Sequence, residues 1–121
     1  MMEMIPKEIP YRDKSEFLRG FLLLIRQDKK ISKYERNMTL VIGKYFGFDE
    51  EFCEESIDSI LVNEYVSNDP PQFSSKSIAK YFVLESYNIL KQIHLLTDTE
   101  LEWLRKTAEA NHLKGELENL S

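Results

Sequence analysis

The chain has 121 residues, a formal net charge of −5, and 42% hydrophobic and 31% charged residues. These values predict one folded domain and argue against a disordered chain. The longest apolar run, Phe21 to Ile25, is too short for a membrane-spanning helix. The negative charge argues against nucleic acid as a partner. No secretory signal is visible at the N-terminus and the single cysteine, Cys53, has no internal disulfide partner, so a cytoplasmic protein is expected.

The chain is predicted to divide into an N-terminal arm, residues 1–13, and a helical domain, residues 14–121. Two prolines in the arm forbid a continuous helix there. The first helix is predicted to begin at Asp13 or Ser15, where a helix-start signature occurs, and to end near Gln27-Asp28. Its apolar residues are numerous enough for burial on more than one side.

Two further helices are predicted in the first half of the chain. The second runs from Ser32 to about Phe46, and Gly47 stands where a left-handed cap would end it. Asp49 is expected to cap the third helix. The predicted inner face of that third helix consists of Phe52, Cys53, Ile57, Ile60 and Leu61.

The second half of the chain predicts a loop and two more helices. The loop covers residues 63 to 73, and Ser74 or Ser75 begins the fourth helix. The fifth helix begins at Thr97 and is expected to end near Gly115, with Trp103 on its flank. No segment alternates strictly enough to be a strand. The predicted fold class is therefore all-α, a single compact bundle of about five helices.

The two strongest helix-start signatures echo one another. Ser32 and Thr97 are 65 positions apart, and so are Glu35 and Glu100. Ser32 with Glu35, and Thr97 with Glu100, have the spacing of a capping box. In such a box the side chain of each residue accepts the backbone N–H of the other. This predicts a degenerate two-fold repeat of helix pairs, with coincidence as the alternative because capping boxes are common.

A family resemblance is carried by the stretch around the first capping box. An apolar helix, then Asp28-Lys29-Lys30-Ile31-Ser32-Lys33-Tyr34-Glu35, then the apolar helix ending at Gly47-Phe48, resembles the TerB-like family linked to bacterial tellurite resistance. The resemblance covers Phe17 to Phe48 well and Phe82 to Leu113 loosely. It implies an all-helical bundle with two pseudo-symmetric halves, a stress-response role, and binding of a divalent cation, Ca²⁺ or Mg²⁺, by acidic residues of the two motifs.

The implied metal site is matched only in part. Asp28 and Glu35 fit the first motif, with a lysine where the family has glycine, and Glu100 fits the second. Asp98 is acidic but out of register, and the family's aspartate position falls on Ile93. If the helix pairs face each other, these four carboxylates would suit a hard cation. The alternative is that both glutamates are ordinary capping residues and that Asp28 stabilises a turn.

The sequence contains no nucleophile elbow, phosphate-binding glycine loop or zinc-protease motif. The leading hypothesis is therefore a non-enzymatic interaction or sensing module with a protein partner, which includes a second copy of itself. One alternative is a small metal-dependent enzyme or enzyme accessory subunit that uses Glu35 and Glu100. Another is a plain helical dimerisation domain. Cys53 is predicted to be a small core residue.

Overall fold

Five helices account for most of the residues that the computed structural model describes, which are 9–28, 30–63, 65–93 and 96–113. No strand occurs within those ranges, so the all-α prediction is confirmed. None of the described helices combines the length and the hydrophobicity that crossing a lipid bilayer requires. The helices are α1 (Tyr11–Arg26), α2 (Lys33–Tyr45), α3 (Glu50–Val62), α4 (Lys76–Ile93) and α5 (Asp98–Ala110).

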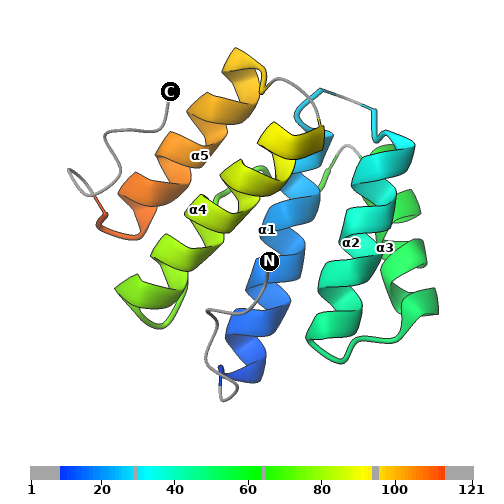
Figure 1. Ribbon diagram of the computed structural model, residues 1–121, viewed down its shortest axis with the longest axis horizontal. Helices are drawn as coiled ribbons and strands as arrows, with labels where there is room; N and C mark the ends of the chain where they lie inside the picture. The colour runs from blue at the N-terminus through cyan, green and yellow to red at the C-terminus, as the bar shows by residue number, and fades with distance from the viewer. Residues whose placement is uncertain (1–8, 29, 64, 94–95, 114–121) are drawn as a thin grey trace.

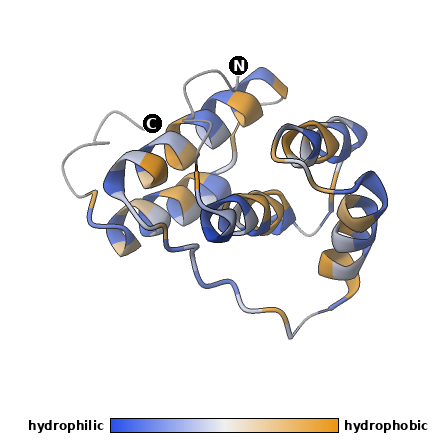
Figure 2. Cartoon of the chain, turned by 90° about the horizontal axis from the view of Figure 1, so that it is seen from below, coloured by the Kyte–Doolittle hydropathy of each residue, from blue (hydrophilic) through white to orange (hydrophobic). Residues whose placement is uncertain are grey.

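Helix α1 is the centre of the bundle and contacts each of the other four helices (Figure 1). It lies between the α2–α3 pair and the α4–α5 pair. Its Phe17 ring is packed edge-on against Phe82 of α4 and Phe46 beyond α2, with centroids 5.0 and 5.1 Å apart. Hydrophobic residues lie mainly on the sides of the helices that face one another (Figure 2). The broad apolar face predicted for the first helix is explained by this central position.

The first helix begins at Tyr11 and not at Asp13 or Ser15, so that prediction is wrong. The carbonyl of Pro10 accepts the N–H groups of Asp13 and Lys14 at 2.9 and 3.1 Å. The Asp13 side chain is fully buried and accepts the backbone N–H of Ser74 at 2.8 Å and its hydroxyl at 2.5 Å. The Asp13 side chain, which was predicted to cap its own helix, therefore bonds Ser74, 61 residues away in the chain.

Helices α2 and α5 end in the same way. Gly47 follows α2 with φ of 85°, and Phe48 N–H donates to the Gly43 carbonyl at 2.8 Å, as predicted for a left-handed cap. His112 follows α5 with φ of 61°, and Leu113 N–H donates to the Ala108 carbonyl at 2.9 Å. The predicted end near Gly115, which lies outside the described residues, is therefore wrong.

The long connection from α3 to α4 runs along one side of the bundle (Figure 2) and is held by side chains of α1 and α5. The Arg26 guanidinium donates to the Val66 carbonyl at 3.2 Å and also to the side chain of Asn68. The Trp103 indole donates to the Asn68 carbonyl at 3.1 Å, and Asn111 bonds the backbone on both sides of Gln72. Trp103 is thus buried, 5% exposed, and not on the flank as predicted.

Candidate functional site

Both predicted capping boxes are present, and their turns lie at the same end of the bundle (Figure 1). Glu35 Oε1 accepts the Ser32 N–H at 2.9 Å, and the Ser32 hydroxyl accepts the Glu35 N–H at 3.1 Å. Glu100 Oε1 accepts the Thr97 N–H at 3.0 Å, and the Thr97 hydroxyl accepts the Glu100 N–H at 3.2 Å. The glutamates are buried, with 4% and 0% exposure. We call this region the capped end: Asp28, Ser32, Glu35, Thr97 and Glu100.

Three of the four predicted metal ligands meet at the capped end. The Thr97 hydroxyl lies 3.3 Å from Asp28 Oδ1 and 3.3 Å from Glu100 Oε1, and it can donate to either. Asp28 and Glu35 line one cavity of about 420 Å³. The fourth residue, Asp98, lines a different cavity, beside Trp103.

The described part of the chain contains no group of three or more His, Cys, Asp or Glu side chains arranged to hold a metal ion. The capped end therefore brings carboxylates near one another without forming a recognisable cation cage. Their bonds include those of the helix caps and of the Thr97 hydroxyl. The cation site stays a prediction.

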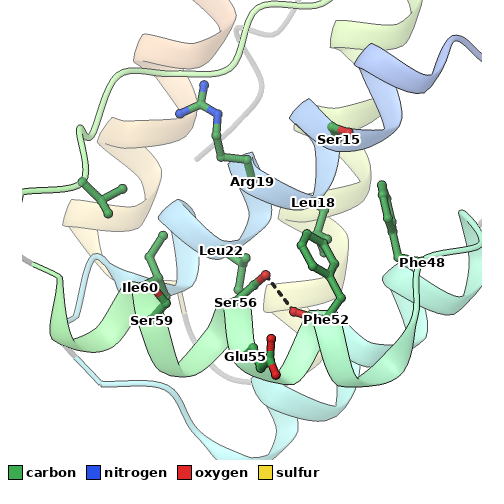
Figure 3. A pocket seen from close by; sticks show the side chains of 11 residues that line it. Ser15, Leu18, Arg19, Leu22, Phe48, Phe52, Glu55, Ser56, Ser59 and Ile60 are labelled. Atoms are coloured by element: carbon green, nitrogen blue, oxygen red, sulfur yellow. Dashed lines mark hydrogen bonds between the residues drawn. The ribbon is translucent and has the colours of Figure 1, made fainter.

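A second region was not predicted from the sequence. A cavity of about 480 Å³ opens between α1 and α3 (Figure 3), within the usual range for ligand pockets of roughly 300–1,000 Å³. We call it the α1/α3 groove. Its lining comprises Ser15, Leu18, Arg19, Leu22, Phe48, Phe52, Glu55, Ser56, Ser59, Ile60 and Val66.

Apolar side chains from both walls dominate the groove. Leu18 and Leu22 line it from α1, and Phe52 and Ile60 line it from α3 (Figure 3). Phe52 is 50% exposed. At one end of the groove its ring is 5.9 Å from that of Phe48, which is 5.8 Å from that of Tyr11. This series of three aromatic rings leaves an apolar surface open to solvent.

Two polar side chains in the lining, Arg19 and Ser56, are bonded within the chain. The Arg19 guanidinium binds both carboxylate oxygens of Glu16, at 3.1 and 3.0 Å, and reaches the Asp69 carbonyl at 3.4 Å. The Ser56 hydroxyl donates to the Phe52 carbonyl at 2.8 Å, as Figure 3 shows. Because these two groups are engaged, the groove offers a ligand mainly apolar contact.

The predicted inner face of α3 is wrong in part, and the groove accounts for one of the two exposed residues, Phe52. Cys53, Ile57 and Ile60 are buried as predicted, whereas Phe52 and Leu61 are 50% and 39% exposed. The sequence signal was present, since the predicted apolar face covers about half the circumference of the helix. One neighbouring layer of helices does not cover a face that wide, and the residues at its two edges, Phe52 and Leu61, stay exposed.

The pKa values of two titratable side chains, Cys53 and Glu85, are raised by their surroundings. Burial, and then the charges of Asp49 and Glu50, raise the pKa of the Cys53 thiol. Its sulfur packs against Gly43, where a side chain would collide with it, so the prediction of a core residue is confirmed. Burial also raises the pKa of Glu85 on α4, whose Oε1 has no hydrogen-bond partner among the described residues.

Comparison with known proteins adds no relative to this description. No family model matches the sequence, and neither the curated proteins nor the solved structures give a match.

Proposed function

We propose that the chain is a non-enzymatic helical interaction module that binds an apolar segment of a protein partner in the α1/α3 groove. The observation that carries the proposal is the half-exposed Phe52, which lies over a cavity of about 480 Å³ whose walls also present Leu18 and Leu22. Large aromatic side chains are enriched at the centres of protein interfaces. Grooves between helices commonly receive the apolar face of a partner helix.

The walls of the groove are held in place by bonds that do not involve a ligand. Arg19 and Glu16 are paired on α1, and Glu16 Oε2 also accepts the Gln72 N–H at 3.2 Å. Arg26 fixes the backbone at Val66, which belongs to the lining. A preformed site of this kind loses less conformational entropy when a ligand binds.

The test uses a labelled helical peptide of about 16 residues with a leucine stripe and an uncharged Gln/Ser face. Fluorescence anisotropy is measured with the wild type and with Phe52→Ser, whose fold is checked by circular dichroism. The proposal expects saturable binding that falls at least about fivefold in Phe52→Ser, since truncated interface anchors cost more than ~1 kcal/mol. Equal binding to both proteins would contradict it.

The TerB-like resemblance adds a cation-sensing role to the proposal. It is supported by the positions of Asp28, Glu35 and Glu100, which gather at the capped end. Thermal unfolding with EDTA, then with millimolar Ca²⁺ or Mg²⁺, tests this role on the wild type and on Glu35→Gln. Glutamine keeps the capping box and removes the charge. A cation at 100 times its Kd stabilises a fold by ~2.7 kcal/mol, so a rise of several degrees that Glu35→Gln abolishes would support it.

A dimerisation domain is the second candidate, and one observation favours it. Tyr34, Met38, Val41 and Tyr45 follow one side of α2 at the spacing of a coiled-coil seam, and all but Met38 are exposed, by 68%, 49% and 45%. Sedimentation velocity should then show a concentration-dependent dimer that Val41→Lys dissociates. A monomer at all concentrations would remove this candidate.

A metal-dependent enzyme remains an alternative without such support. Glu35 lines the cavity at the capped end, but Glu100, its proposed catalytic companion, is not part of that lining. The link to tellurite or stress likewise depends on the family resemblance alone.

A further inference from the structure

The charge of the helix that forms one wall of the groove specifies the partner more closely. Helix α3 carries five acidic side chains and no lysine or arginine. The five, Glu50, Glu51, Glu54, Glu55 and Asp58, are all exposed.

Only part of this charge pattern benefits the fold. Glu50 and Glu51 lie in the first turn, where the helix dipole favours negative charge, but Glu54, Glu55 and Asp58 lie beyond it. Like charges three and four positions apart on a helix repel each other. One of these acids, Asp58, forms an ion pair with Arg36 of α2 at 2.8 Å, which offsets this repulsion.

One of the acidic side chains lines the groove, and a second lies close to it on the same helix. Glu55 belongs to the lining, and Glu51 lies one turn before it on the same side of α3. The cationic residue of the lining, Arg19, is already paired with Glu16. Phe52 and Ile60, the apolar residues that α3 contributes to the lining, are eight positions apart and so about 12 Å apart along the helix, which matches about two turns of a partner helix. An apolar floor beside an acidic rim is complementary to an apolar stripe flanked by positive charge.

We propose that the α1/α3 groove binds an amphipathic helix whose apolar stripe is flanked by lysine or arginine. This inference rests on the proposed function and names the chemistry of the partner. The stripe fills the space between Leu18, Leu22 and Phe52, and the flanking cations face Glu51 and Glu55. The rim charges speed association and select against acidic helices, and salt weakens both effects.

The experiment compares two labelled peptides with the same leucine stripe, one flanked by lysines and one by glutamates. Their affinities are measured by fluorescence anisotropy at low and high salt. Binding of the lysine peptide is expected to be at least tenfold tighter at low salt, and the ratio should shrink as salt rises. The rim variant Glu51→Lys/Glu55→Lys should reverse the preference.

A matched control separates the rim from the net charge of the protein. Glu102→Lys/Glu109→Lys changes two exposed glutamates of α5 and alters the net charge equally. It should leave most of the preference intact, and an effect as large as that of the rim variant would overturn the inference. Equal affinity for the two peptides, lost in Phe52→Ser, would overturn the inference but leave the proposed function standing. Binding that is indifferent to Phe52→Ser would remove both.

Discussion

The capped end and the α1/α3 groove use their side chains in opposite ways. At the capped end, Glu35 and Glu100 are buried acids that accept backbone N–H groups and so complete two helix starts. In the groove, Phe52 exposes half of its surface although the chain has an ample apolar core. Glu35 and Glu100, which the sequence suggested as metal ligands, cap helices, whereas Phe52, which the sequence assigned to the core, is half exposed to solvent. Three pairs of substitutions test this contrast, and a seventh substitution concerns a residue outside both regions.

The largest difference in the free energy of unfolding is expected between substitutions on the buried side and on the exposed side of α3. Ile57 is fully buried, so Ile57→Ala should lower the free energy of unfolding by about 2–5 kcal/mol. Phe52→Ala should lower it by only about 1 kcal/mol, because half of the ring is already in water. Chemical denaturation of both variants measures the difference. Equal losses would mean that Phe52 belongs to the core after all.

Glu100→Ala comes next. It removes an acceptor for the Thr97 N–H from a fully buried position, so a loss of about 2 kcal/mol is expected. Thermal unfolding should show a drop of several degrees. Glu102→Ala, on the exposed side of the same helix, is the control and should change stability by less than about 0.5 kcal/mol. A similar small change in Glu100→Ala would contradict its role in the fold.

The two capping boxes should differ from each other by a smaller amount. Ser32→Ala should cost about 1 kcal/mol, the usual value for a lost N-cap. Thr97→Ala should cost more, up to about 2 kcal/mol, because the Thr97 hydroxyl also contacts Asp28 at the end of α1. Urea denaturation of the two variants gives the comparison. The reverse order would show that the contact with Asp28 contributes nothing.

The smallest effect concerns Glu85, which belongs to neither region. A carboxyl whose pKa is raised in the folded state opposes folding while it is ionised, and this penalty disappears as the pH falls through the raised pKa. Glu85→Gln should therefore raise the melting temperature slightly at pH 7, by about one or two degrees. The gain should vanish at acidic pH. A gain that does not depend on pH would assign it to packing instead.

Sequence reasoning predicted the helices and both capping boxes because these depend on residues within one turn of each other. It failed where a distant residue decides the outcome. Asp13 bonds Ser74 and so does not cap its own helix, and Trp103 reaches the backbone of Asn68. The groove could not be predicted, because apolar periodicity marks a wide face on α3 but does not reveal which edge of that face the neighbouring helices leave uncovered. Whether the two halves form a true repeat remains a prediction.

The most direct test of the contrast is to map the contact surface by NMR. The ¹⁵N-labelled protein is titrated with the lysine-flanked leucine peptide, and backbone amide shifts are followed residue by residue. The largest shifts are expected along α1 and α3, around Leu18, Leu22, Phe52 and Ile60, with little change at Ser32 and Thr97. Shifts confined to the capped end, with α3 unaffected, would contradict this expectation.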